Sequence, residues 1–162
     1  MAFDGAFLHQ LKREIEQNAL GAKVDKVHQP SRDEVILSLR GKEMNGRLLL
    51  SARASSPRIH FTRELPENPP APPMFCMLLR KRLISGKLTA VRQPGLERVL
   101  LLDFTCVNEL GDTVINTLAM EIMGRYSNVI LVGGDGRVVD ALRRVNAEMT
   151  TGRLGLPGME YQ

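Results

Sequence analysis

The sequence predicts an α+β fold in which an antiparallel, β-sandwich-like sheet packs against two main helices. Two segments repeat apolar residues at helical spacing, and most of the remaining chain alternates apolar and polar residues in short runs. Short turns join these runs and indicate antiparallel pairing, because parallel neighbours need long crossover connections. The length of 162 residues and the hydrophobic content of 43% suit one domain with a full core.

The first helix is expected to begin near Asp4, which can cap it. Charged residues occupy one face, and Gly21 can end the helix. The opposite face repeats apolar residues at three- and four-residue spacing, namely Phe7, Leu8, Leu11 and Ile15. This face is therefore expected to lie on a larger apolar surface.

Alternating residues predict three strands, at 33–40, 46–52 and 58–63. The next segment, 64–73, holds five of the nine prolines and is expected to be extended, since proline is excluded from helix interiors and central strands. A proline-rich run can be a ligand for SH3-type domains. This run ends where a helix pattern begins, so we favour a structural lead-in.

The second helix is expected over 74–85, with Gly86 after it. Its apolar face contains Phe75, Leu78, Leu79 and Leu83, with Arg82 as a further candidate. Arg80, Lys81 and Arg82 are each turned by about 100° from the next and cannot all point one way. One of them is therefore expected at the edge of the core, with its charged head turned outward.

Further strands are expected after the second helix. They lie at 87–93, 97–106, 112–123, 127–132 and 137–142. Glycine-containing turn sequences separate them. Periodicity ends near Val145, so the domain is expected to span residues 1–144, with 145–162 as an exposed C-terminal tail or linker.

Composition argues against several classes of protein. Two cysteines, no Trp and 4% aromatic residues do not suit a disulfide-rich miniprotein, a zinc module or an aromatic base-stacking platform. The sequence shows neither a secretory leader pattern nor an apolar run long enough for a membrane span. We therefore expect a cytoplasmic protein.

Known catalytic motifs are not found in the sequence. His9, His28 and His60 lie on separate segments without the spacing of metal ligands. The glycines at 133–136 lack the Lys and Ser or Thr of a phosphate-binding loop and fit a hairpin turn better. We expect no enzyme activity, no catalytic residues, no metal and no cofactor.

The excess of positive charge lies in one part of the sequence. The net charge is +4, and between residues 74 and 100 six Lys and Arg residues stand against Glu97 alone. The rest of the chain holds sixteen basic and seventeen acidic residues. Concentrated basic residues are typical of proteins that bind a polyanion, although a solvated face is the commoner explanation of a charge run.

Two polar clusters are candidate binding sites. In residues 93–98 a Pro-Gly turn presents Glu97 and Arg98 at the start of a strand, beside the basic helix. Arg can form two hydrogen bonds with a phosphate, but a surface ion pair worth roughly 0–1 kcal/mol is the plainer interpretation. In residues 121–128 Gly124 indicates a bulge or a close backbone approach, and a tight turn with local side-chain caps is the plainer interpretation.

Several segments resemble one family in their order along the chain. They read FDGAFLHQL, KVHQP, LLLSA, PRIH, PPMFCMLLRKRL, QPGLER, NELGD, EIMGRYSN and LPGMEY. They are similar to the N-terminal domain of the NFACT family, known in bacteria as fibronectin-binding protein A or RqcH. Members of that family are longer, so the resemblance implies further domains.

The resemblance implies a role in ribosome-associated quality control. Family members bind the obstructed large ribosomal subunit, recruit alanyl-tRNA and support template-free alanine tailing of stalled peptides. Their Asp-Arg pair, which engages tRNA, corresponds to Glu97 and Arg98, so the acid is one methylene longer here. Tyr126 stands where the family usually has His. The RNA-binding residues that we expect are Glu97, Arg98, Arg80, Lys81, Arg82, Lys87, Arg125 and Asn128.

The resemblance also implies a fold like that of the N-terminal domain of formamidopyrimidine-DNA glycosylases. Those enzymes use an N-terminal Pro-Glu, and this chain reads Met-Ala-Phe-Asp instead, so glycosylase or nuclease activity is the least favoured hypothesis. The name fibronectin-binding protein supports an alternative, a surface adhesin domain whose partner is fibronectin. The leading hypothesis is an RNA-binding module with tRNA and the large ribosomal subunit as partners and no membrane contact.

Overall fold

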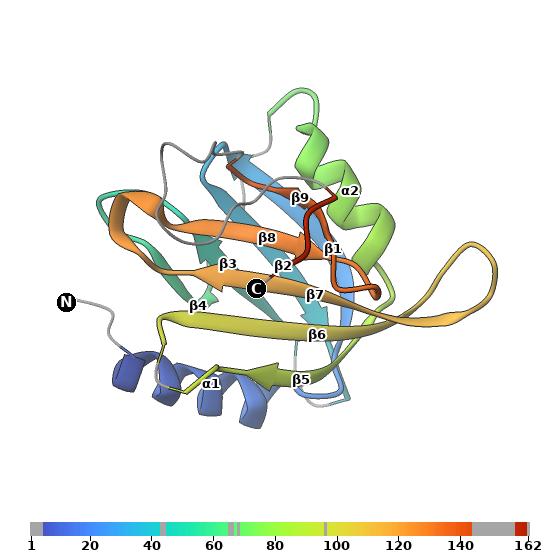
Figure 1. Ribbon diagram of the computed structural model, residues 1–162, viewed down its shortest axis with the longest axis horizontal. Coiled ribbons are helices and arrows are strands. Elements are labelled where there is room, and N and C mark those ends of the chain that lie inside the picture. Colours follow the sequence, from blue (N-terminus) through green and yellow to red (C-terminus); the bar gives the residue numbers. More distant parts are fainter. Residues whose placement is uncertain are drawn as a thin grey trace.

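The computed structural model describes residues 5–42, 45–64, 67, 69–95, 97–143 and 158–161. Over these residues it contains two α-helices, α1 (Gly5–Ala19) and α2 (Met74–Leu83), and a 3-10 turn, η1 (Gly124–Tyr126). The strands are β1 (Lys23–Ser31), β2 (Glu34–Arg40), β3 (Asn45–Ser51), β4 (Arg58–Thr62), β5 (Lys87–Arg92), β6 (Val99–Val107), β7 (Thr113–Glu121), β8 (Asn128–Val132) and β9 (Val138–Ala141). The expected α+β class with an antiparallel sheet is confirmed (Figure 1).

The strands form one antiparallel sheet in the order β4-β3-β2-β1-β5-β6-β7-β8-β9. β1 and β5 share one paired position, Lys23 with Lys87, so the sheet divides there into β1–β4 and β5–β9. β3 contacts β8, which shows that the two parts bend toward each other. In Figure 1, β5–β9 lie in front of β1–β4.

The main core lies between the two parts of the sheet and the helices. Both parts contribute fully buried side chains: Leu37, Leu48, Leu50, Ile59, Leu100, Leu102, Phe104, Leu118 and Leu131. α1 packs on β5 and β6 through Leu8 and Ile15, and α2 packs on β1 through Phe75 and Leu79. Burial stabilises the fold by about 1.5–3 kcal/mol for each large side chain.

β6 is buried on both faces, which explains its nearly continuous apolar sequence. Leu100, Leu102 and Phe104 belong to the main core, while Val99 and Leu101 belong to a second cluster on the outer face. That cluster also includes Ala119, Ile130, Val132, Val138 and Ala141. The β5–β9 part of the sheet therefore has apolar side chains on both faces.

β1 is a strand that the sequence pattern did not predict. Its pairing with β2 shifts register between Val24 and Lys26 and again between His28 and Ser31. Such irregularities disrupt the two-residue alternation on which strand prediction depends. The other expected strands are present, with ends that differ by a few residues.

α2 ends at Leu83, earlier than expected, because the backbone of Ile84, with φ −58° and ψ 133°, is no longer helical. Ser85 has φ 70°, and Gly86 follows it. A Cβ at Gly86 would lie 2.6 Å from Cys106 Sγ and 2.8 Å from Leu83 O. Only glycine fits this close approach without a shift of its neighbours.

Residues 158–161 lie against β9. Val138 N donates to Met159 O (2.7 Å), and Tyr161 N donates to Gly136 O (2.9 Å). This short segment is therefore held by the fold. The rest of the expected tail and Asp4 lie outside the described residues, so the domain boundary at 144 stays a prediction.

Neither of the two described helices has the length and apolar character that a membrane crossing requires.

Candidate nucleic-acid interface

The Pro-Gly turn before β6 is fixed by hydrogen bonds. Gln93 Nε2 donates to Gly5 O at the start of α1 (2.9 Å) and to Glu97 O (2.8 Å). Glu97 N donates to Pro94 O (3.0 Å). Glu97 and Arg98 are both exposed. The turn therefore presents these two side chains to solvent from a well-supported backbone.

The second polar cluster lies beside this turn. Ile122 N donates to Arg98 O (2.9 Å), because the antiparallel pairing of β6 and β7 brings the start of β6 to the end of β7. We call this end of the sheet, formed by residues 93–95, 97–98 and 122–127, the loop end; it lies on the left of Figure 1. The structure thus brings together two clusters that are separate in the sequence.

The chain around Gly124 is a tight turn with local caps. Ser127 Oγ accepts a hydrogen bond from Met123 N (2.9 Å) and donates one to Gly124 O (2.7 Å). Gly124 has φ 57°, and a Cβ there would meet no atom within 4 Å. The expected bulge or close approach is therefore wrong, and the plainer interpretation is confirmed.

Arg125 is exposed but held in a defined orientation. Its guanidinium carbon lies 4.9 Å from the centroid of the Tyr126 ring, and Nη2 donates to Tyr126 Oη (2.9 Å). A cation over an exposed aromatic ring gains about 0.5–1 kcal/mol. Tyr126, the residue that departs from the family pattern, therefore orients the neighbouring arginine.

Asn128 has a structural role. It is only 4% exposed. Its Nδ2 donates to Arg143 O (2.8 Å), and its Oδ1 accepts from Arg143 N (2.9 Å). The amide joins the start of β8 to the residues after β9 and presents no surface to a ligand, which corrects the expected RNA contact by Asn128.

Arg143 is a residue of this end that the sequence analysis missed. Its Nη1 donates to Arg125 O (2.8 Å), and its Nη2 donates to Asp33 Oδ1 (3.1 Å). It therefore connects the loop end with the β1–β2 turn in the other part of the sheet. Arg53 forms an ion pair with Glu34 (3.0 Å) in the same region. Asp33 and Arg143 are 110 positions apart, so no local pattern predicts their contact.

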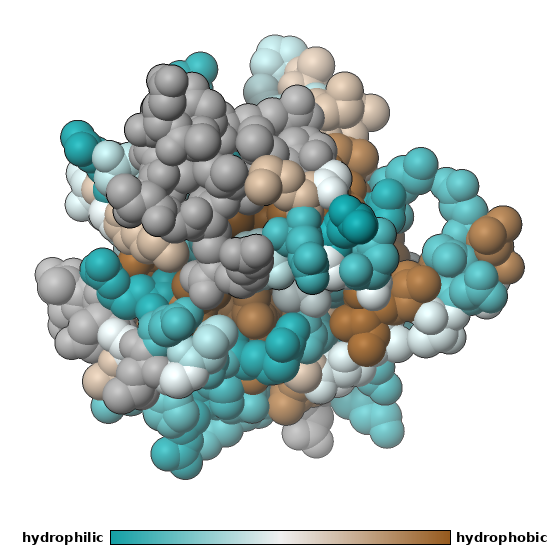
Figure 2. Space-filling view, viewed as in Figure 1, coloured by the Kyte–Doolittle hydropathy of each residue, from teal (hydrophilic) through white to brown (hydrophobic). Residues whose placement is uncertain are grey.

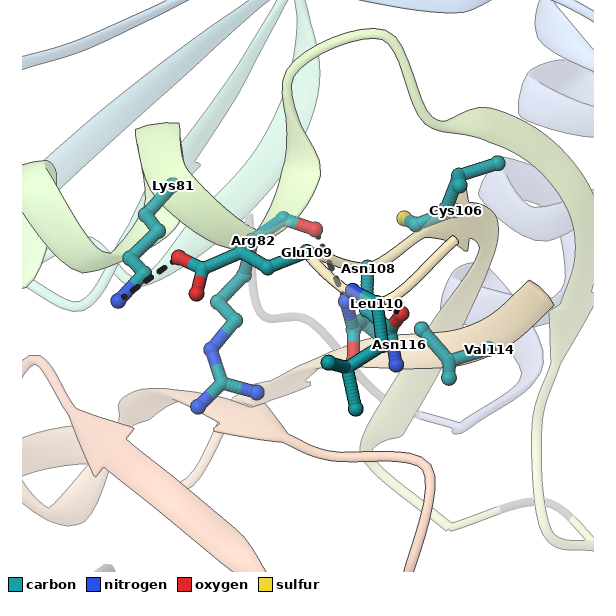
Figure 3. A pocket seen from close by; sticks show the side chains of 9 residues that line it. Lys81, Arg82, Cys106, Asn108, Glu109, Leu110, Val114 and Asn116 are labelled. Atoms are coloured by element: carbon teal, nitrogen blue, oxygen red, sulfur yellow. Dashed lines mark hydrogen bonds and ion pairs between the residues drawn. The ribbon is translucent and has the colours of Figure 1, made fainter. Parts of the chain in front are cut away.

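The basic residues of α2 lie at the opposite end of the sheet. Lys87 pairs with Thr105, about 20 Å along β6 from Val99. α2 ends there beside the β6–β7 hairpin, and the two line a hollow of about 280 Å³ (Figure 3). We call the end of α2 and this hairpin the hairpin end. The expectation that Glu97 and Arg98 lie beside the basic helix is therefore wrong.

The three cations of α2 have different surroundings. Arg80 is half-buried, and its Nε donates to Val27 O (2.9 Å). It is the cation expected at the edge of the core, whereas Arg82 is exposed. Lys81 is exposed, and its Nζ lies 3.4 Å from Glu109 Oε1 (Figure 3).

Arg92, another residue of the basic segment, is bound to a buried carboxylate. Its Nε and Nη2 donate to Asp103 Oδ2 (2.7 Å) and Oδ1 (2.9 Å), and Thr117 Oγ1 donates to Asp103 Oδ1 (2.7 Å). The hydrogen bonds to Asp103 raise the pKa of Arg92. Asp103 was missed by the sequence analysis; an acid within an apolar strand was the signal, because a buried charge needs a partner.

The buried thiols and His28 titrate away from their ordinary values. Burial raises the pKa of Cys76 and of Cys106, so both thiols are protonated at neutral pH. Burial, helped by the charge of Arg80, lowers the pKa of His28. The described residues include no group of three or more His, Cys, Asp and Glu side chains placed to hold a metal.

Comparison with known proteins relates the whole chain to one family. The model of the family "NFACT N-terminal and middle domains" matches residues 4–162. The Rqc2 homolog RqcH of Bacillus subtilis is 40% identical over 163 residues, which cover 100% of this chain and 29% of that protein. The ribosome quality control complex subunit NEMF of Mus musculus is 28% identical over 142 residues, or 87% of this chain and 12% of its own length.

A solved structure shares the fold. The N-terminal domain of the fibronectin-binding protein PavA from Streptococcus pneumoniae matches with a TM-score of 0.93 and 33% identity, over 99% of this chain and 61% of that one. This chain spans less than a third of the length of the curated relatives that it matches. It belongs to the family of NFACT N-terminal and middle domains, which includes a subunit of the ribosome quality control complex.

Proposed function

We propose that this chain is an RNA-binding module of a ribosome quality-control factor and that its loop end binds tRNA. The observation that carries the proposal is the meeting of two separate polar clusters there, with Arg98 and Arg125 exposed. Among the described residues, neither guanidinium forms an ion pair with a carboxylate. Both are therefore available to phosphate groups.

The side chains of the loop end suit different contacts with RNA. Arg98 follows a fixed turn, and its guanidinium can donate two parallel hydrogen bonds to one phosphate. Arg125, oriented by Tyr126, can place its planar group against a base. Glu97 extends one methylene further than the Asp of the family and can accept a hydrogen bond from a base amine.

The cations at the hairpin end have a secondary place in the proposal. Three exposed cations, Lys81, Arg82 and Lys87, attract a polyanion electrostatically and independently of its sequence. Arg80 donates to a backbone carbonyl, so we assign it to the fold.

The family resemblance extends the proposal to the whole factor. In that factor the module holds alanyl-tRNA on the obstructed large ribosomal subunit, in the cytoplasm, and supports template-free alanine tailing. The module itself is not an enzyme and needs no cofactor. The likeness of its fold to formamidopyrimidine-DNA glycosylases stays a prediction and brings no activity, because the sequence lacks the N-terminal Pro-Glu of those enzymes.

Fluorescence anisotropy with labelled tRNA, and with a DNA duplex for comparison, tests the proposal. The double variant Arg98→Ala/Arg125→Ala is compared with Arg82→Ala/Lys87→Ala, which removes equal charge from the hairpin end. We expect the first to weaken tRNA binding about tenfold or more and to reduce its salt dependence by about one phosphate contact, that of Arg98. The control is expected to change affinity less than about threefold, since its cations make no specific contact. Equal losses would show that net charge, and not the loop end, binds the RNA.

A second candidate function follows from the name of the structural neighbour, a fibronectin-binding protein. The hairpin end offers exposed apolar side chains for protein contact, with Val107 72% and Leu110 85% exposed. Surface plasmon resonance on immobilised fibronectin measures whether the chain binds that protein. Saturable binding that Leu110→Asp abolishes, together with no tRNA binding, would replace the RNA proposal.

A further inference from the structure

A groove lies on the outer face of β5–β8, next to the loop end. It encloses about 460 Å³. Its apolar floor is formed by Val99, Leu101 and Val132, and its polar residues are Arg92, Asp103 and Thr117. We call it the sheet-face groove. In Figure 2, hydrophobic and hydrophilic residues lie side by side on this face of the molecule.

Strand register explains why these residues meet. Leu101 of β6 stands opposite Arg92 of β5, and Asp103 stands opposite Thr117 of β7. Thr117 in turn pairs with Val132 of β8. Because side chains on one face recur every second residue, Val99, Leu101 and Asp103 all point to the groove.

Arg92 presents a fixed, planar edge to this groove. Asp103 binds its Nε and Nη2, and Thr117 holds the carboxylate in place. The ion pair does not use Nη1, and the Arg92 side chain is 55% exposed. The outer edge of the guanidinium is therefore accessible to a ligand while its plane is fixed.

The remaining lining suits a flat ring. Tyr161 is half-buried, and its hydroxyl donates to Glu121 Oε2 (2.7 Å), which fixes the aromatic ring at the groove. Gly133 and Gly134 line the groove with backbone alone. An aromatic ring, glycine backbone and an aliphatic floor favour a planar apolar surface over a branched one.

The groove is continuous with the turn that carries Arg98. Pro94 lines it, and Val99, the residue after Arg98, lies in its floor. The groove therefore begins next to the turn, within reach of a nucleotide that is bound at the loop end.

We propose that the sheet-face groove binds one unstacked purine base of RNA, with guanine preferred. This inference rests on the proposed function of the loop end. Guanine offers O6 and N7 as adjacent acceptors, which match two N–H groups on one edge of an arginine. A pyrimidine has a smaller ring to bury on the floor and lacks this acceptor pair.

Methyl NMR with mononucleotides tests the groove without relying on tRNA binding. Guanosine 5′-monophosphate is expected to shift the methyl resonances of Val99, Leu101 and Val132, at concentrations at which uridine 5′-monophosphate leaves them unchanged. Equal shifts with both nucleotides, or shifts confined to residues 122–127, overturn the proposal.

Two variants and a matched control sharpen this test. Ile115→Trp fills the groove from a half-exposed position and is expected to weaken guanosine binding at least about fivefold. Val107→Trp adds the same side chain on the neighbouring strand outside the groove and should leave binding unchanged. Arg92→Lys keeps the charge but not the planar edge, and is expected to abolish the preference for guanine. Thermal unfolding confirms that each variant is folded.

Failure of the groove and failure of the proposed function are distinguishable. If Arg98→Ala weakens tRNA binding while Ile115→Trp and Arg92→Lys do not change base preference, the loop end binds RNA and the groove proposal is wrong. If the unaltered chain does not bind tRNA, the proposed function is wrong, and the mononucleotide titration decides the groove separately.

Discussion

The loop end and the hairpin end both carry cationic side chains, but the fold surrounds them differently. At the loop end, Arg98 and Arg125 are exposed on turns that backbone and hydroxyl groups hold in place. At the hairpin end, Arg80 donates to Val27 O, and Lys81 pairs with an acidic residue of the β6–β7 hairpin. Among the described residues, Arg98 and Arg125 form no ion pair with a carboxylate, whereas Arg80 is half-buried against a backbone carbonyl and Lys81 pairs with Glu109.

This difference teaches that charge density along a chain is a poor guide to charge density on a surface. The basic segment between residues 74 and 100 runs from α2 through β5 into β6, so its cations are divided between opposite ends. Arg98 instead lies at the same end as Arg125, because the β6–β7 pairing brings Ile122, three residues before Arg125, to the backbone of Arg98. Strand connectivity decides which charges act together.

Two glycines are expected to give the largest contrast between the ends. Gly86→Ala at the hairpin end places a Cβ against Cys106 Sγ and the Leu83 carbonyl, and is expected to lower the free energy of unfolding by about 2–4 kcal/mol. Gly124→Ala at the loop end meets no neighbour and carries only the left-handed backbone penalty of about 1–2 kcal/mol. Urea denaturation measures both. Equal losses would mean that the hairpin end accommodates a new atom as easily as the loop end.

The next contrast lies within α2. Arg80→Ala removes a half-buried stem and a hydrogen bond to Val27 O, and is expected to cost about 1–2 kcal/mol of stability. Lys81→Ala removes an exposed ion pair and should cost less than about 0.5 kcal/mol. Chemical denaturation of the two variants side by side is the measurement. A larger loss for Lys81→Ala would contradict the assignment of Arg80 to the fold.

A smaller effect is expected where the loop end joins the other part of the sheet. Arg143→Ala removes hydrogen bonds to Arg125 O and Asp33 and should cost about 1 kcal/mol. Arg53→Ala serves as the control: the Arg53 side chain is 50% exposed against 27% for Arg143, so its ion pair with Glu34 should be worth less than about 0.5 kcal/mol. The shifts in the denaturant midpoint of unfolding show which of the two variants loses more stability. The reverse order would show that Arg143 is dispensable to this contact.

The smallest expected effect is a pH dependence from His28. Burial and Arg80 lower the pKa of His28 in the folded chain below its ordinary value of 6.5. The unfolded chain therefore takes up this proton at higher pH, so the stability contribution is present above about pH 6.5 and is lost as the pH falls toward the folded pKa. The midpoints of denaturant unfolding at pH about 7.5 and about 5.5 should differ less for His28→Gln than for the unaltered chain. An unchanged pH slope in that variant would assign the effect to other groups.

Local periodicity made much of the fold predictable. The repeat of Leu8 and Ile15 indicated a helix with one buried face, and α1 has that face. β1 escaped prediction because its register shifts displace side chains from simple alternation. The rotation of about 100° per residue in a helix indicated that one cation of α2 lies near the core. Only the tertiary structure shows which one, because Arg80 and not Arg82 donates a hydrogen bond to Val27 O.

The sequence predicted some residues of the candidate site but not how these residues are arranged. Glu97, Arg98 and Arg125 are exposed, as a binding role requires. Asn128 is buried against the backbone of Arg143, a contact that depends on tertiary structure. Asp103 and its bond to Arg92 follow from the pairing of β5 with β6, which the sequence pattern does not specify.

The two parts of the sheet are connected by different forces at their two ends. Near the hairpin end, backbone hydrogen bonds join them, from Val24 N to Gly86 O (2.9 Å) and from Leu88 N to Ala22 O (2.9 Å). At the loop end, Arg143 and Asp33 join them through an ion pair. Mobile ions screen exposed charges strongly and part-buried pairs much less, so the Arg143–Asp33 pair, with side chains 27% and 26% exposed, is expected to persist at moderate ionic strength. Rising ionic strength is therefore expected to weaken the attraction of the exposed Arg98 and Arg125 for a polyanion while the two parts of the sheet stay joined at this end.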